Sequence, residues 1–216
     1  MKKKLILICI CFSTAIFSQK KVMKSLQTNA SEINIYTKGL DNIILENSSN
    51  NFLEVILEAK SYDEQLIKID ENDKQVAINF DFEGTETREV IFRKFITKRL
   101  QRATAIVKIP KGKKVYVFGE NVDIESNNLI NDLAIYIDNG IVKLNNILQK
   151  TLLKLYSGNV YATTKNTRTK IISNLGKINV DDELYEKLYE NQPTISNRKL
   201  EIITIKGNIF IAKEDY

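Results

Sequence analysis

From residue 113 onward, hydrophobic and polar residues alternate in short stretches, and the alternation restarts at a small or polar residue. Five copies of this pattern occur, and they are centred on Glu120, Gly140, Gly158, Gly176 and Gly207. The four intervals between these centres measure 20, 18, 18 and 31 residues. The last interval equals one ordinary step plus an insertion around residues 182–194. Because the apolar residues recur with period two, the pattern predicts β-strands that bury one face.

Four positions in each copy form columns, at five and three residues before the centre and at two and four residues after it. Eighteen of these twenty positions are apolar, and Ser173 and Thr204 are the exceptions. One column consists of Val122, Val142, Val160, Ile178 and Ile209. A single two-stranded unit cannot bury its apolar face alone, so we expect the copies to stack about 4.8 Å apart and to share one core. The central glycines, and the asparagines at 127–128 and 145–146, are suited to the two corners of each coil.

These observations predict an all-β protein, a β-solenoid (parallel β-helix-like) of roughly 18-residue coils with an irregular N-terminal β cap. The competing all-β interpretation is a sandwich of consecutive hairpins. Residues 30–110 also alternate, but their repeat is degenerate, as terminal coils that shield the end of a core should be. The predicted organisation is a signal peptide at 1–18, the cap and first irregular coils at 19–110, and repeats at 111–216. The insertion contains a helix-like stretch at 183–190.

The first residues have the pattern of an export signal. Lys2, Lys3 and Lys4 precede an apolar run at 5–17, and Ala15 or Ser18 offers a cleavage site. The run is shorter than the roughly 20 residues of a spanning helix, although an uncleaved N-terminal anchor is the alternative. Both cysteines lie inside the run, so the mature chain has no disulfide. We therefore expect an exported protein, periplasmic or at the cell surface, with no transmembrane segment after cleavage.

Removing the signal also changes the charge of the chain. The full chain carries +5, but three of its 32 basic residues and none of its 27 acidic residues lie in the signal, which leaves +2. The apparent basicity therefore belongs largely to the signal, and nucleic acid is not an expected partner.

Several catalytic systems are excluded by composition. The chain has no histidine, which removes Ser-His-Asp and Cys-His systems and the usual zinc sites. Nucleotide-binding glycine patterns are absent, and the acidic run Asp181–Glu183 lacks calcium-loop spacing and fits a solvated turn better. We expect no cofactor and no metal. A weak alternative is a carboxylate-dependent polysaccharide lyase or hydrolase that uses the outward-pointing Asp123, Asp138 and Lys143.

Candidate ligand-binding residues form two groups. The first is aromatic and outward-pointing: Tyr116 and Tyr136 share one column and are expected to be neighbours on adjacent coils, and Phe118 and Tyr156 share another. Such a patch suits glycan rings or a protein partner. Alternatively, the rings ladder with one another, or the N-terminal sheet or the insertion covers them. The second group is a basic strip at 88–102, suited to an anionic surface or to the tips of a solvated hairpin. Its basic residues are Arg88, Arg93, Lys94, Lys98, Arg99 and Arg102, of which Arg93, Lys94, Lys98 and Arg99 are the candidate binding residues.

The segment Ala105–Gly112, followed by glycine-cornered copies that end at Ile211, resembles the bacterial putative-adhesin β-solenoid family of exported proteins, which are largely of unknown function. The resemblance covers about residues 30–213, and Glu120 and the insertion depart from the pattern. It implies adhesion or envelope roles and transfers no catalytic residue. We expect a non-enzymatic binding module that contacts protein or glycan of the cell envelope through the outer face of the solenoid. The alternative is a structural or regulatory accessory that docks on a membrane partner.

Overall fold

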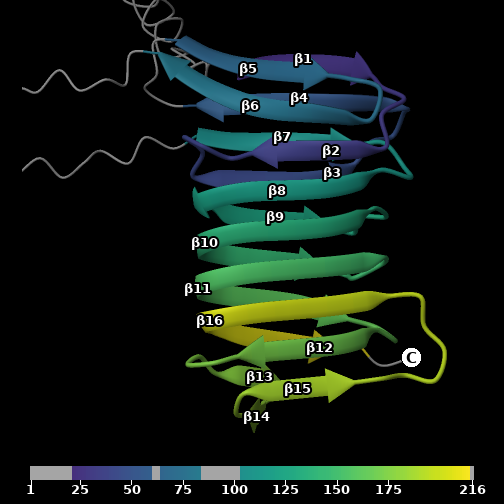
Figure 1. Ribbon diagram of the computed structural model, residues 1–216, viewed down its shortest axis with the longest axis vertical. Coiled ribbons are helices and arrows are strands. Elements are labelled where there is room, and N and C mark those ends of the chain that lie inside the picture. The colour runs from purple at the N-terminus through teal and green to yellow at the C-terminus, as the bar shows by residue number, and fades with distance from the viewer. Residues whose placement is uncertain (1–20, 60–63, 84–102, 215–216) are drawn as a thin grey trace, which may run out of the picture.

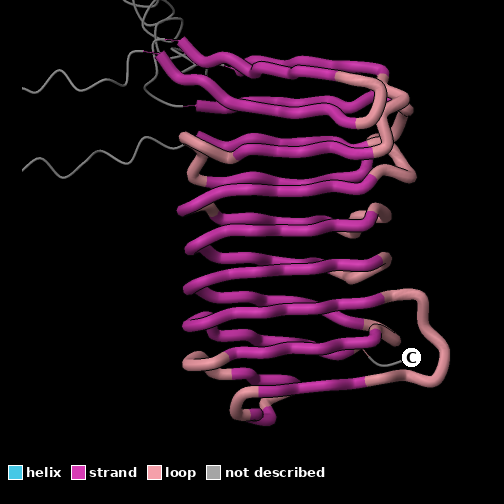
Figure 2. Tube along the Cα trace, in the orientation of Figure 1, coloured by secondary structure: helices cyan, strands magenta, loops and turns pink. Residues whose placement is uncertain are grey.

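The computed structural model describes residues 21–59, 64–83 and 103–214. Within these ranges there are sixteen strands and no helix, so no described segment is a helix able to cross a membrane. The strands lie across the long axis of the molecule and are stacked along it (Figures 1 and 2). The prediction of an all-β protein is confirmed. The expected signal peptide and the basic strip with Arg93, Lys94, Lys98 and Arg99 lie outside the described residues.

The strands form two layers that share one core. Layer 1 begins with four strands in the order β5 (Glu64–Glu71), β6 (Gln75–Glu83), β2 (Glu32–Tyr36) and β8 (Lys114–Asn121). It continues with the first halves of three long strands, β10 (Asp132–Asn145), β11 (Lys150–Thr164) and β16 (Lys199–Lys213). It ends with β12 (Arg168–Ser173) and β15 (Leu188–Asn191). Layer 2 begins with five strands in the order β1 (Lys21–Gln27), β4 (Phe52–Ala59), β7 (Ala103–Ile109), β3 (Asn42–Asn47) and β9 (Asp123–Asn127). It continues with the second halves of β10, β11 and β16. It ends with β13 (Ile178–Val180) and β14 (Glu183–Tyr185). The three long strands pass from one layer to the other, which joins the layers into one open sheet.

Neighbouring strands in the centre of the stack are parallel and in register. The glycines Gly140, Gly158 and Gly207 are successive partners. All twenty positions of the predicted columns are buried. The two polar ones are satisfied at the corner, because the Ser173 hydroxyl donates to the Gly207 carbonyl at 3.0 Å and Thr204 Oγ1 accepts from the Gly207 N–H at 2.8 Å. The apolar columns therefore form one core between the layers.

The two corners at which the chain passes between the layers are formed differently. At the first corner Gly158 has φ +128°, and a Cβ added there would lie 2.0 Å from the Gly140 carbonyl oxygen. Only glycine therefore lets the backbone of one coil approach the next this closely. At the second corner Asn128 and Asn146 have φ 51° and 61°, and Asn146 Nδ2 donates to Asn128 Oδ1 at 2.6 Å. Asparagine tolerates this left-handed conformation and also bonds its copy on the neighbouring coil.

The expected register of the first copy is wrong by two residues. Val142 pairs with Ile124 rather than with Val122, and Ile135 pairs with Val117. Val122 instead lies at the corner, where its carbonyl oxygen is the atom nearest to a Cβ added at Gly140. The step from β8 and β9 to β10 is therefore 18 residues, like the step from β10 to β11. A two-residue shift leaves every side chain on the same face, so the hydrophobic pattern alone does not reveal it.

The expected order of the last coils is also wrong. The C-terminal β16 lies between β11 and the β12–β13 coil, so Ile209 separates Val160 from Ile178. The stretch 183–190 is not helical: it forms β14 and β15, which pair antiparallel with β13 and β12. After β13 the chain therefore reverses direction and adds β14 and β15 to the outer edges of β13 and β12. It then returns as β16, which lies on the inner side of β12 and β13, next to β11. The short antiparallel strands cover an edge that would otherwise be free to pair with another chain.

At the opposite end, residues 32–47 continue the parallel stack. Ile33 pairs with Val115, and Ile43 pairs with Ile124. Their outer neighbours β6 and β7 are also parallel to them. Beyond β6 and β7 the pairing becomes antiparallel, with β4 on β7, β1 on β4 and β5 on β6. Both ends of the stack therefore finish in antiparallel strands.

Candidate binding surface

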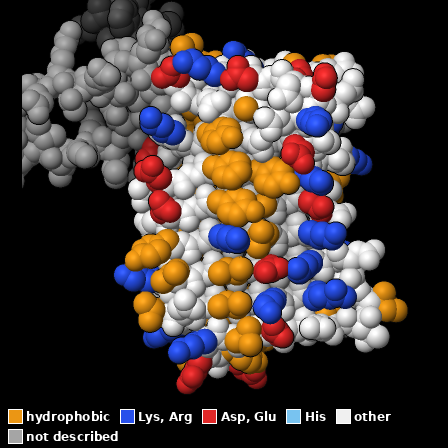
Figure 3. All heavy atoms as spheres, in the orientation of Figure 1, with side chains coloured by type: hydrophobic (Ala, Val, Ile, Leu, Met, Phe, Trp, Pro, Cys, Tyr) orange, Lys and Arg blue, Asp and Glu red, His pale blue; other side chains and the backbone are white. Residues whose placement is uncertain are grey.

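The outward face of layer 1 carries a group of aromatic side chains, here called the aromatic strip and made up of Tyr36, Tyr116, Phe118 and Tyr136. They occupy alternate positions of β2, β8 and β10, whose intervening residues form the core. Because side chains alternate across a strand, burying the aliphatic residues places these rings on the outside. Figure 3 shows hydrophobic side chains gathered along the middle of this face.

Phe118 is the centre of the aromatic strip. Its ring centroid lies 5.4 Å from that of Tyr36, 6.4 Å from that of Tyr116 and 5.5 Å from that of Tyr136, with interplanar angles of 20°, 9° and 10°. The Lys154 ammonium lies 5.8 Å from the Tyr136 centroid. Tyr36, Phe118 and Tyr136 are register partners on adjacent strands, so the faces of these three rings cover one another. Tyr116 lies beside Phe118 on the same strand. A ligand on this face therefore meets mainly ring edges.

The strip differs in two ways from the sequence expectation. Tyr136 has Phe118 as its partner, and Tyr116 has Ala134, so Tyr116 and Tyr136 are not neighbours in one column. This follows from the two-residue shift of the first copy. Tyr36 belongs to the strip but is absent from the prediction, because the repeat is degenerate before residue 110. The alternation Ile33, Ile35 and then an aromatic residue on the opposite face is the signal that could identify it.

The fourth predicted aromatic residue lies apart from the strip. Tyr156 is 49% exposed, and the Lys206 ammonium lies 5.4 Å from its ring centroid. It lines a shallow groove together with Tyr136, Lys154 and Ile205. The structure thus brings Tyr116, Phe118 and Tyr136 together and places Tyr156 at the edge of the same face.

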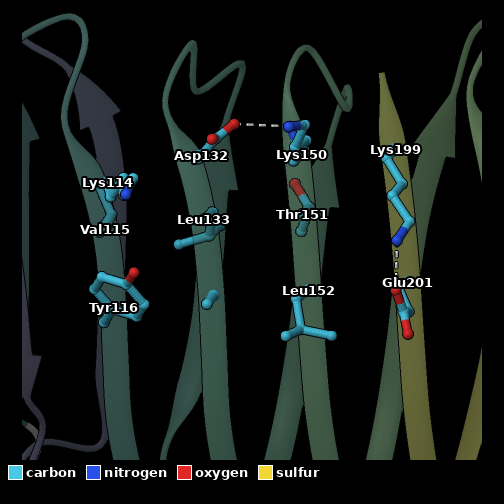
Figure 4. A pocket seen from close by; sticks show the side chains of 11 residues that line it. Lys114, Val115, Tyr116, Asp132, Leu133, Lys150, Thr151, Leu152, Lys199 and Glu201 are labelled. Atoms are coloured by element: carbon cyan, nitrogen blue, oxygen red, sulfur yellow. Dashed lines mark hydrogen bonds and ion pairs between the residues drawn. The ribbon is translucent and has the colours of Figure 1, made fainter. Parts of the chain in front are cut away.

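A second groove runs across four neighbouring strands beside the strip and is here called the lysine groove. Its volume is about 320 Å³. Apolar atoms of Tyr116, Ala134 and Leu152 line one part, and Glu201 lies next to Leu152 in the same row. The opposite part carries charges: Lys114, Asp132, Lys150 and Lys199. Figure 4 shows these side chains along β8, β10, β11 and β16. Lys199 pairs with Glu201 at 2.7 Å, and the Lys150 backbone N–H donates to Asp132 Oδ1 at 3.3 Å.

The carboxylates of the weak enzyme hypothesis are not assembled into one site. Asp123 Oδ1 accepts the Ile141 N–H at 2.7 Å and so holds the corner. Asp138 and Lys143 lie on opposite sides of Gly140, in layers 1 and 2. In the described ranges, no group of three or more His, Cys, Asp or Glu side chains is arranged to hold a metal ion.

The acidic run after β13 is a turn, as expected. Asp181 and Asp182 have φ 50° and 68°. Asp181 Oδ1 accepts the Lys213 N–H at 2.8 Å, and the Lys213 ammonium lies 3.2 Å from Oδ2. The backbone N–H of Lys213 and then its side chain lower the pKa of Asp181 below its usual value. The turn therefore fastens the end of β16.

No family model and no curated protein matches this sequence. Among solved structures, a putative cell adhesion protein from Clostridium sporogenes is 15% identical with a TM-score of 0.61, over 91% of this chain and 100% of that one. A putative adhesin from Bacteroides fragilis is 13% identical with a TM-score of 0.26, over 91% and 98%. One from Parabacteroides distasonis is 12% identical with a TM-score of 0.26, over 90% and 98%.

The Clostridium neighbour is thus a putative cell adhesion protein, in agreement with the resemblance of the sequence to a putative-adhesin family. At 15% identity, the likeness to the Clostridium protein shows a shared fold. Function must therefore be argued from the surface of this chain.

Proposed function

We propose that this protein is an exported, non-enzymatic, adhesin-like binding module of the bacterial cell envelope. In this proposal the parallel stack is a β-solenoid of roughly 18-residue coils, and the outer face of layer 1 contacts a protein or glycan. The observation that carries the proposal is the aromatic strip, which lies on the outside of a rigid sheet. The signal-like N-terminus supports export.

Aromatic rings on a sheet surface are well suited to recognition. Tyrosine and phenylalanine offer a large contact area with few rotatable bonds, so a partner orders little side-chain freedom when it binds them. Their stacking on Phe118 fixes the rings further. Tyr36 is 40% exposed, and the other three rings of the strip are partly exposed. An exposed group of this kind, bordered by charged residues, is typical of an interaction site.

The test compares two stacked aromatic pairs on opposite layers. In layer 1, Phe118→Ala with Tyr136→Ala removes the centre of the strip. In layer 2, Tyr161→Ala with Phe210→Ala removes a similar pair, whose centroids lie 5.1 Å apart. Mature protein is applied to a glycan array and to immobilised envelope proteins. We expect the layer 1 variant to lose binding and the layer 2 variant to keep it. Equal binding by both variants would refute a role for this face.

A second candidate function is docking on a membrane partner through the returned segment at 182–194. Its support is the exposure of apolar side chains there and just beyond: Leu184 is 72% exposed, Leu188 52% and Ile195 84%. Changing these three residues to serine should abolish co-purification with the membrane fraction if this segment docks. Co-purification that depends instead on Phe118 and Tyr136 would favour the aromatic strip.

A further inference from the structure

Three basic residues lie side by side where three adjacent strands of layer 1 begin: Lys150 on β11, Lys199 on β16 and Arg168 on β12. Lys199 is the register partner of Lys150 on one side and of Arg168 on the other. We call these three residues the cation column. Parallel strands are about 4.8 Å apart, so the column presents three positive charges at steps of that size.

The charges of the cation column are only partly neutralised. Within the described part of the chain, Glu201 pairs with Lys199 at 2.7 Å, whereas no ion pair involves Lys150 or Arg168. The nearby Lys170 has its own partner, Glu190, at 2.9 Å. Like charges that are directly opposite on adjacent strands destabilise a sheet. The column therefore opposes folding slightly, and a bound anion would relieve the repulsion.

The column borders the lysine groove, whose remaining lining is largely apolar apart from Lys114, Asp132 and Glu201. Lys150 and Lys199 belong to both the column and the groove. The groove also contains Lys114 on β8, which is separated from the Lys150 strand β11 by β10. The apolar residues Tyr116, Ala134 and Leu152 lie two positions further along β8, β10 and β11, beside Lys114, Asp132 and Lys150. Glu201 continues their row on β16, beside Lys199. A suitable occupant has anionic groups along one side and apolar ring surface along the other, and it extends in the direction of stacking.

We propose that the lysine groove binds an acidic polysaccharide, a polymer of sugar rings that carry carboxylate groups. Its carboxylates pair with Lys150, Lys199 and Arg168, and the C–H surfaces of its rings lie against Ala134 and Leu152. Successive strands then meet successive parts of the polymer. This inference rests on the proposed binding function and names the class of glycan. Charge-assisted hydrogen bonds to carboxylates supply the affinity, and the repeated spacing supplies the selectivity for a polymer.

The primary experiment measures the affinity of the mature protein for polygalacturonate fragments by calorimetry. The test variant combines Lys150→Gln with Arg168→Gln, and leaves the Lys199–Glu201 pair intact. The control combines Lys24→Gln with Lys38→Gln, which removes the same charge from exposed positions near the other end of the stack. Loss of two charge-assisted contacts should weaken binding at least about tenfold, whereas the control should stay within about twofold. Equal affinity for the test variant and the wild type would overturn the proposal.

A gain-of-binding variant guards against loss through misfolding. Glu201→Gln frees Lys199 and removes a negative charge from the groove, so it should bind polygalacturonate more tightly than the wild type. Binding should weaken as salt rises, because exposed charges are screened. No gain with Glu201→Gln, or equal affinity for an uncharged galactan, would contradict the proposal.

Two further arms separate this inference from its alternatives. If vesicles of phosphatidylglycerol and phosphatidylcholine bind through Lys150 and Arg168 while polygalacturonate does not, the ligand is a lipid surface and the polysaccharide proposal fails. If the Phe118 and Tyr136 variant loses its partner but the cation-column variant behaves as wild type, the proposed function stands and this inference fails. If only the cation-column variant loses binding, the inference stands and the role of the aromatic strip fails.

Discussion

Replacing Gly158 with alanine tests how the chain passes from one layer to the other. The residue has φ +128°, which side chains with a Cβ rarely adopt, and strain of this kind costs about 1–3 kcal/mol. The added Cβ would also lie 2.0 Å from the Gly140 carbonyl oxygen, on the neighbouring coil. That contact is far below van der Waals distance, and overpacking against ordered structure costs about 1–3 kcal/mol more.

The two contributions predict a loss of about 4 kcal/mol in the free energy of unfolding. For a chain of this length each kcal/mol shifts Tm by about 2–4 °C, so Gly158→Ala should lower Tm by about 8–16 °C. The assay is thermal unfolding followed by circular dichroism. Gly112→Ala is the control, because Gly112 has φ +78° but nothing within 4 Å of an added Cβ. It should cost only about 1 kcal/mol, from backbone strain alone. Equal Tm values for the two variants would refute the close approach of adjacent coils.

Three further predictions concern the other contacts that hold the stack. Phe118→Ala removes a ring stacked on both sides, so we expect a loss of about 2 kcal/mol in urea unfolding, and an unchanged midpoint would contradict the stacking. Asn146→Ala places alanine in a left-handed conformation and removes the hydrogen bond to Asn128, so the free energy of unfolding should fall by about 1–2 kcal/mol. Asn146→Gly removes the same hydrogen bond without the backbone strain and should cost clearly less. The reverse order of stability would contradict the left-handed corner. Because the folded-state pKa of Asp181 is lowered, its contribution is present above the ordinary carboxyl pKa and is lost as pH falls through the lowered value. The protection of amides at the end of β16 against hydrogen exchange, relative to their intrinsic rate at each pH, should therefore fall in acid for the wild type, and an equal pH response in Asp181→Asn would disprove this link.

Much of the candidate surface follows from the sequence, but its internal arrangement does not. Alternation placed Tyr116, Phe118 and Tyr136 on the outer face, since the residues between them are aliphatic and buried. Which ring contacts which depends on the register between β8 and β10, and a shift of two residues leaves all the faces unchanged. The placement of Lys150 and Arg168 on either side of Lys199 likewise does not follow from the sequence. They lie 18 residues apart in sequence, but Lys199 separates them in the stack.

Local sequence was enough to predict the all-β character of this protein, the inward columns and the two kinds of corner. It could do so because these features depend only on local alternation and on the backbone freedom of glycine and asparagine. The tertiary structure alone decided the order of the coils, the return of residues 183–191 as edge strands and the insertion of β16 between β11 and β12. The inward columns of all coils are chemically alike, so any coil can stack on any other as far as hydrophobicity is concerned. Only the loop lengths, the edge contacts and the close fit at each corner select one order.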